Sequence, residues 1–195
     1  MMKILLLVGV VLLEGSFAKP CCMPDQWSAV TVDTVGEYNR DLDSASLLYG
    51  SRTYYHDNNA SAIAYFEVSD NTTAHKHVSK HVIKNFKQMK MYTIVGKTCT
   101  TEDLQNKMPP ACIPDDATSF GHHMYPGGVS VDTWFWKDSS SGASVRLGVS
   151  SDRCLPITES NLSSGPDYIL RTSLYQNVTT GIRDPMAFFV PTFCT

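Results

Sequence analysis

The sequence predicts a mainly β protein whose antiparallel strands stack or curl around a core, with few, short helices. Hydrophobic residues alternate with polar ones along several segments, and turn-forming stretches separate those segments. A single segment, 75–88, is a candidate helix, and it is polar enough to be a loop instead. A curved antiparallel sheet has one concave apolar face, which is either filled by side chains or kept open for a ligand.

Two neighbouring segments form the clearest hairpin. In Val131–Trp136 the side chains of Trp134 and Trp136 fall on one face, and in Ser144–Ser150 every second residue is apolar. The polar, turn-forming stretch 137–142 lies between them. Two indoles on one strand face offer a broad apolar surface with a donor at its edge, so we expect them to form a ligand wall. Alternating aromatic residues also fill cores, and that alternative stays open.

Further strands are expected where β-branched and aromatic residues alternate between turns. In Tyr168–Val178 the more apolar side includes Leu170 and Leu174, and the polar side includes Asn177. The remaining strand candidates are 29–34, 45–49, 53–56, 62–68 and 89–95. The residues we expect to line an apolar pocket are Trp134, Trp136, Val145, Leu147, Val149, Leu170, Leu174 and Met91.

The first 18 residues have the pattern of a signal peptide. Lys3 gives a basic start, residues 4–13 are apolar, and small residues lead up to Ala18. About ten apolar residues are too few to cross a bilayer, which needs about 20. We therefore expect cleavage after Ala18 and a single secreted domain over residues 19–195, with no transmembrane segment.

The charge balance argues against nucleic acid as a partner. Without Lys3 and Glu14 the chain has 15 basic and 18 acidic residues, and the basic ones are scattered rather than gathered in a stripe.

The six cysteines, all beyond residue 18, predict a disulfide framework in an oxidising compartment. Their number does not fix their pairing, although the neighbouring Cys21 and Cys22 should join different partners. A zinc site is disfavoured because no C-x-x-C pair occurs. Four sequons mark candidate glycosylation sites at the surface, with acceptors Asn59, Asn71, Asn161 and Asn177.

No local catalytic signature is present: G-x-S-x-G, H-E-x-x-H, Walker and G-x-G-x-x-G motifs are all absent, so we expect no enzyme. His77 and His81 would meet on one face of a helix, but a third metal ligand is missing. Calcium would need oxygen ligands from separate loops, because Ser46 and Arg52 occupy EF-hand positions that require Gly and Glu. The metal ligands stay unassigned, and the candidate oxygen donors are Asp41, Asp43, Asp115 and Asp116.

Several stretches resemble the ependymin family, in the same order and over essentially all of the chain after residue 18. The most specific is the last, in which a glycine, an Asp-Pro, a Phe and a Pro-x-x-Cys ending occur together. The stretches are Pro20–Trp27, Met89–Cys99, Ile113–Thr118, Val129–Trp136, Asp152–Ile157 and Gly181–Cys194.

The resemblance implies two packed, curved antiparallel sheets that form a half-open sandwich or barrel with an apolar pocket, similar to bacterial lipoprotein carriers and usually dimeric. It also implies that Cys99 pairs with Cys194, that Cys154 pairs with Cys21 or Cys22, and that Cys112 takes the other. The family is associated with hydrophobic and anionic lipid-like ligands, with calcium, and with extracellular or lysosomal location.

The leading hypothesis is a secreted glycoprotein that carries or sequesters a hydrophobic or lipid-like ligand, with no cofactor required apart from an optional calcium ion. The alternative is an extracellular cell-matrix adhesion or signalling protein that acts through calcium and glycans. Routing to a lysosome is left open beside secretion.

Overall fold

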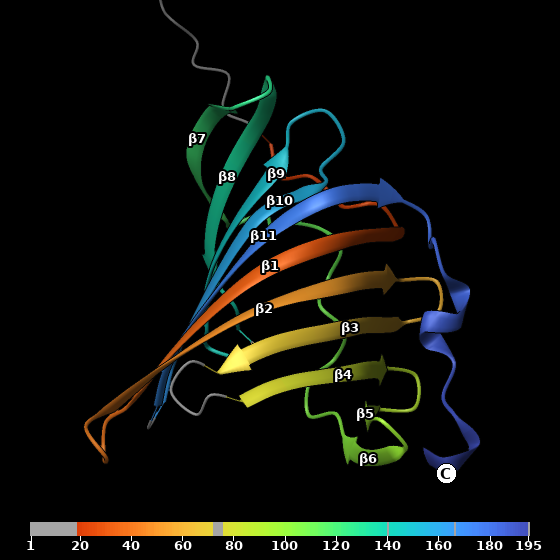
Figure 1. Ribbon diagram of the computed structural model, residues 1–195. Helices are drawn as coiled ribbons and strands as arrows, with labels where there is room; N and C mark the ends of the chain where they lie inside the picture. Colours follow the sequence, from red (N-terminus) through yellow and green to blue (C-terminus); the bar gives the residue numbers. More distant parts are fainter. Residues whose placement is uncertain (1–18, 72–75, 140, 166, 195) are drawn as a thin grey trace, which may run out of the picture.

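In the computed structural model, the described residues are 19–71, 76–139, 141–165 and 167–194, so the expected signal peptide lies outside them. These residues form eleven antiparallel strands and two short 3-10 helices, which confirms the mainly β prediction (Figure 1). The strands are β1 (Gln26–Asn39), β2 (Ser44–Asp57), β3 (Ala62–Asn71), β4 (Lys76–Asn85), β5 (Lys90–Val95), β6 (Thr98–Asp103), β7 (Thr118–Tyr125), β8 (Val129–Lys137), β9 (Ser144–Ser150), β10 (Pro156–Ser164) and β11 (Asp167–Thr180), and the helices are η1 (Pro185–Phe188) and η2 (Thr192–Cys194).

All eleven strands belong to one hydrogen-bonded sheet, in the order β6-β5-β4-β3-β2-β1-β11-β10-β9-β8-β7. The sheet is bent and open, because β6 and β7 lie at its two ends (Figure 1). The two halves expected as packed sheets are therefore continuous through the central pair β1 and β11. The connection 104–117 carries the chain from one end of the sheet to the other.

The hairpin predicted around the two tryptophans is confirmed as β8 and β9, with Trp134 opposite Leu147 and Trp136 opposite Val145. The candidates 45–49 and 53–56 are parts of the single strand β2. The candidate helix is wrong, because Lys76–Asn85 is the strand β4. Val78 and Val82 are four residues apart and Ile83 follows directly, and this spacing fits a helical stripe at least as well as a strand face.

Directly opposed residues in antiparallel strands share a face, so the register defines an inner and an outer face of the sheet. The inner face carries Trp27, Asp33, Ile63, Val82 and Leu147, all of which are buried. The outer face carries the apolar residues of β11 and the middle of β1, which are exposed. The bend thus encloses the inner face.

Two segments close the ends of the sheet. On the inner face of β8 and β9, Ile113 packs with Trp134, Leu147, Val149 and Cys154. On the outer face, the C-terminal segment places Ala187 against residues of β2 to β5: Tyr55, Ala64, Ile83 and Ile94. His81 on β4 bonds the Ala187 carbonyl oxygen at 2.7 Å.

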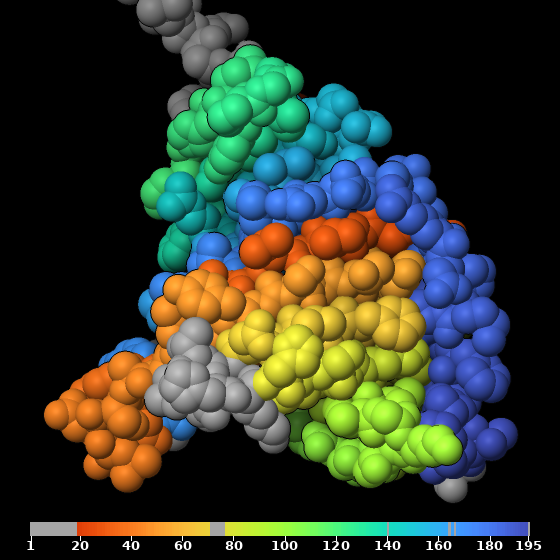
Figure 2. Space-filling view, in the orientation of Figure 1, coloured from red at the N-terminus to blue at the C-terminus, as the bar shows by residue number. Residues whose placement is uncertain are grey.

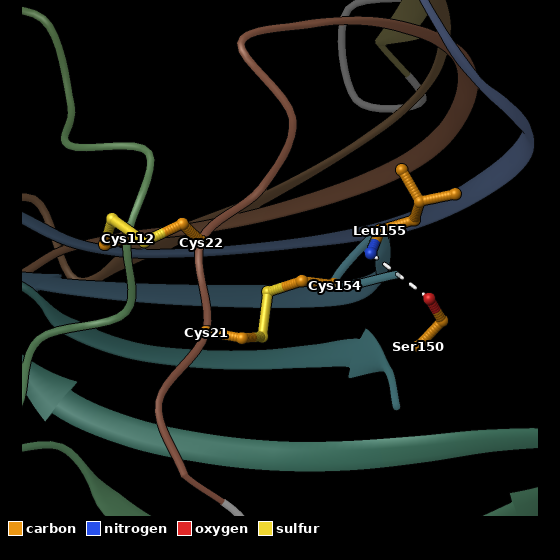
Figure 3. Close-up of a disulfide and its surroundings, with 6 residues drawn as sticks. All are labelled: Cys21, Cys22, Cys112, Ser150, Cys154 and Leu155. Carbon is orange, nitrogen blue, oxygen red and sulfur yellow. Dashed lines mark hydrogen bonds between the residues drawn. A yellow bond between two sulfur atoms is a disulfide. The ribbon is translucent and has the colours of Figure 1, made fainter. Parts of the chain in front are cut away.

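Three disulfides fix these segments. The bonds Cys21–Cys154 and Cys22–Cys112 hold the N-terminal segment and the connection 104–117 (Figure 3). The bond Cys99–Cys194 ties the C-terminal segment to β6. The resemblance implied this pairing, and the structure assigns Cys21 to Cys154. Beside them the Leu155 amide donates to Ser150 Oγ at 3.2 Å, which orders the turn between β9 and β10 (Figure 3).

Gly148 is required by close packing rather than by backbone conformation. A Cβ at this position would lie 2.6 Å from Thr158 Oγ1 and 3.1 Å from a Val131 methyl carbon. We expect Gly148→Ala to lower the free energy of unfolding by about 1–3 kcal/mol, the usual effect of overpacking. Urea denaturation measures it, with Gly36→Ala as control because no atom lies within 4 Å of that Cβ. Equal stability of both variants would contradict the account.

Candidate ligand-binding face

The eight expected pocket residues do not line one cavity. Trp134 is 2% exposed and lies with Leu147 and Val149 in the core beneath the N-terminal segment, against which Trp136 is half-buried. Val145 shares this inner face, and Met91 lies on the inner face of β5 opposite Lys84. At the tryptophans, therefore, the inner face is a filled core.

Leu170 and Leu174 correct the expected lining. They lie on the outer face and are 48% and 42% exposed, so they cannot share a pocket with Trp134. Alternation distinguishes two faces of β11 but does not tell which one the bend encloses. The enclosed face of β11 is its more polar one, with Arg171, Ser173 and Tyr175.

A buried ion pair lies at the centre of the inner face. Arg52 on β2 donates to both carboxylate oxygens of Asp33 on β1, at 2.5 and 2.8 Å. Ser173 on β11 donates to Asp33 at 2.5 Å, and Thr31 donates at 2.7 Å. Burial alone would raise the pKa of Asp33, but the hydrogen bond and charge of Arg52, together with the two hydroxyls, hold it below 3.8.

Aromatic rings lie beside this ion pair. Trp27 stacks on Tyr54 at 5.2 Å and on His56 at 5.3 Å, and it meets Tyr175 edge-on at 5.8 Å. Tyr175 donates its hydroxyl to Glu159 on β10, and burial raises its pKa. Like that of Trp134, the indole N–H of Trp27 is buried and has no hydrogen-bond acceptor among the described residues. An unpaired buried donor costs free energy, so this position favours a bound acceptor.

Unpaired cations face the same space. Lys84 on β4 lies on the inner face opposite Ile63, and Arg171 lies on the inner face opposite Val35. Among the described residues, neither forms a salt bridge. Burial, then the charges of Arg52 and Arg171, lowers the pKa of Lys84. Half-buried cations without partners are typical of a site for an anionic group.

A hollow of about 700 Å³ adjoins this cluster where the turns at the ends of β8 and β9 meet β11. Tyr175 belongs to both the hollow and the aromatic cluster. The apolar lining includes Leu155, Ile157 and Val178, and the rim includes Arg153. Its volume lies in the range of small-molecule sites.

Sequence reasoning missed these residues because a single charge within a strand does not show which face of the sheet the bend encloses. One signal was available in the sequence. On the polar side of β11, Arg171 and Tyr175 lie two residues before and after Ser173, and this is not a run of typical surface residues. The pairing of Asp33 with Arg52 left no sequence signal, because the two lie on different strands.

The structure does not bring the histidine and acidic candidates together into one group. Within the described residues no group of three or more His, Cys, Asp or Glu side chains could hold an ion. His77 instead contacts Asp70 at 2.7 Å, and on a strand it lies about 13 Å from His81. Asp43 accepts a hydrogen bond from Tyr38, and Asp41, Asp115 and Asp116 are exposed in turns.

The sequon asparagines differ in environment. Asn59 and Asn177 are exposed. Asn161 is half-buried on the inner face and donates to Glu159 at 2.6 Å. The side chain of Asn71 lies outside the described residues.

One open, bent antiparallel sheet with aromatic and cationic side chains on its inner face defines the class of fold. Its family is shown by sequence: the ependymin family model matches residues 74–194, and the chain belongs to that family. No curated protein sequence matches it. No helix among the described residues is long and apolar enough to cross a membrane.

Two solved structures are similar in overall shape. An uncharacterized conserved protein from Thermus thermophilus has 9% identity and a TM-score of 0.47, with 87% of each chain covered. A LolA superfamily protein from Nitrosomonas europaea has 8% identity and a TM-score of 0.35, over 85% of this chain and 91% of that one. At these TM-scores neither neighbour carries an argument about what this chain binds.

The ion pair gives a direct stability test. Arg52→Met leaves the Asp33 carboxylate buried and unpaired, so we expect it to lower the free energy of unfolding by about 3–5 kcal/mol at pH 7. Because the pKa of Asp33 is depressed, the pair stabilises the fold above pH 3.8, and this contribution is lost as the pH falls further. The difference between wild type and variant should therefore shrink in acid.

Urea denaturation at pH 7 and pH 3 measures this difference. The control is Lys90→Met, which removes a partner from the exposed Lys90–Asp103 pair and should leave the midpoint unchanged. A constant difference between wild type and Arg52→Met at the two pH values would rule out the assigned ionisation.

Proposed function

We propose that the protein binds an amphiphile on its inner face and carries or sequesters it outside the cell. The observation that carries this proposal is that two donors share the inner face with the rings of Tyr54, Tyr65 and Tyr175. Among the described residues the Lys84 ammonium has no salt-bridge partner, and the Trp27 indole N–H has no acceptor. A long-chain anion matches both parts: its head accepts hydrogen bonds, and its chain lies on apolar surface.

Burial supplies the driving force for such binding. Each Å² of apolar surface removed from water contributes about 25 cal/mol, so an acyl chain in the hollow gains several kcal/mol. The anionic head offsets the cost of keeping Lys84 charged among other cations. No covalent step is required, and the protein acts as a carrier rather than an enzyme.

Secretion fits this function. The three disulfides suit an oxidising compartment, and residues 1–18 supply an export signal ahead of one domain over 19–195. Asn59 and Asn177 are the acceptors best placed to carry glycans, since their side chains are exposed.

Removing the Lys84 charge tests the head-group site. We expect Lys84→Met to weaken palmitate binding roughly 10- to 100-fold, the usual range for a lost charge-assisted hydrogen bond. Affinity for hexadecanol should hardly change, because the alcohol has no charge. Displacement of a fluorescent fatty acid measures both affinities.

The matched control is Lys87→Met in the exposed turn after β4, which should bind palmitate like wild type. Lys84→Arg should recover most of the affinity. Equal losses for palmitate and hexadecanol would show that Lys84 acts through folding and not through charge.

We propose further that two copies associate through the outer face. Ten apolar side chains on β10, β11, β1, β2 and β3 form one stripe and are each 37–50% exposed: Val32, Tyr38, Leu47, Tyr49, Phe66, Val68, Leu162, Tyr168, Leu170 and Leu174. At about 150–250 Å² each in full, they expose on the order of 800 Å², the area each partner buries in a standard interface. No charged residue lies among them on β10, β11 and β1.

Leu174→Glu should convert a dimer to a monomer, because it buries a charge at the centre of this stripe. Sedimentation equilibrium measures the mass. Leu42→Glu, at an apolar residue exposed in the β1–β2 turn, serves as control and should stay dimeric. A wild-type monomer, or a dimer that survives Leu174→Glu, would contradict the assignment.

A further inference from the structure

The β7–β8 hairpin ends in an apolar turn that projects from the molecule (Figure 2). Pro126 and Gly127 occupy the corner of this turn, and the Gly128 amide donates to the Tyr125 carbonyl oxygen at 3.1 Å. Gly127 and Gly128 have φ of 88° and 78°, in the left-handed region that glycine adopts readily. The turn is therefore a defined structure that presents its neighbours to solvent.

The side chains around this turn are apolar and exposed. Met124 is 65% exposed, Val129 40% and Tyr125 37%. Residues 124–131 include no charged residue. We call Met124, Tyr125 and Val129 the hairpin tip.

The hairpin tip is continuous with the hollow described above. Gly128 and Val129 form part of its lining, and Leu155, Ile157 and Val178 continue that lining inward. An apolar molecule that enters the hollow from this end passes the hairpin tip first. The tip therefore lies where a carrier would meet the source of its ligand.

Area distinguishes a bilayer from a protein as the partner of this surface. At about 200 Å² per full side chain, the hairpin tip exposes roughly 300 Å², less than half of what each partner buries in a standard protein interface. Insertion into a bilayer needs only a few apolar side chains, with tyrosine at the head-group level. The absence of charge over 124–131 suits the neutral head groups of such a surface.

We propose that the hairpin tip inserts shallowly into a phospholipid bilayer and holds the hollow open to it. The purpose of this contact rests on the amphiphile-binding function proposed above. Docking itself is measured without any soluble ligand. The contact is apolar, so it should be insensitive to salt.

Co-sedimentation with phosphatidylcholine vesicles at 0.15 and 0.5 M NaCl tests the inference. We expect wild type to bind at both salt concentrations, and the double variant Met124→Glu/Tyr125→Glu to bind at least about tenfold more weakly, because carboxylates do not enter the bilayer. The double variant Met124→Leu/Tyr125→Phe should bind like wild type. Leu174→Glu changes the outer face instead and should also bind the vesicles.

Two further measurements keep the outcome clear. Thermal denaturation and palmitate binding of the glutamate variant should match wild type, which separates loss of docking from unfolding or from failure of the proposed function. Undiminished vesicle binding by that variant, or no vesicle binding by wild type, would overturn the inference. Loss of the dimer in the glutamate variant would also overturn it and assign the hairpin tip to a contact between copies.

Discussion

The Asp33–Arg52 ion pair is the interaction on which the arrangement of this protein depends. It joins β1 to β2, and the hydroxyl of Ser173 extends it to β11, so the three central strands share one buried polar network. A buried carboxylate is tolerated only when its hydrogen bonds are complete. The bend of the sheet must therefore enclose this face, and the apolar residues on the other side of β11 are left outside.

As a consequence, the two faces of the sheet differ in chemical character. The inner face combines aromatic rings with cations, which suits a ligand that has a polar head and an apolar body. The apolar stripe on the outer face has no charged residue on β10, β11 and β1, which suits a contact with another copy. Three disulfides hold the covering segments against the sheet.

Much of the fold could be predicted from the sequence, since alternation along β8 and β9 and the turn between them are local patterns. The family resemblance supplied the long-range pairing of Cys99 with Cys194, which spacing alone does not determine. The proposed binding face could not be predicted, because no local pattern shows that Asp33 pairs with Arg52 on another strand or which face the bend encloses. Leu170 and Leu174 were therefore placed in a pocket when they lie outside it, and Lys84, in a segment taken for a helix or loop, was missed.

The central claim is that the head of an amphiphile contacts Lys84 on the inner face. Amine acetylation followed by mass spectrometry, on delipidated protein with and without palmitate, tests it most directly. The lowered pKa of Lys84 leaves more of its amine uncharged, so it should react readily in the empty protein. Palmitate should slow acetylation of Lys84 several-fold and leave the exposed Lys87 unaffected, whereas equal acetylation of Lys84 with and without palmitate would contradict the account.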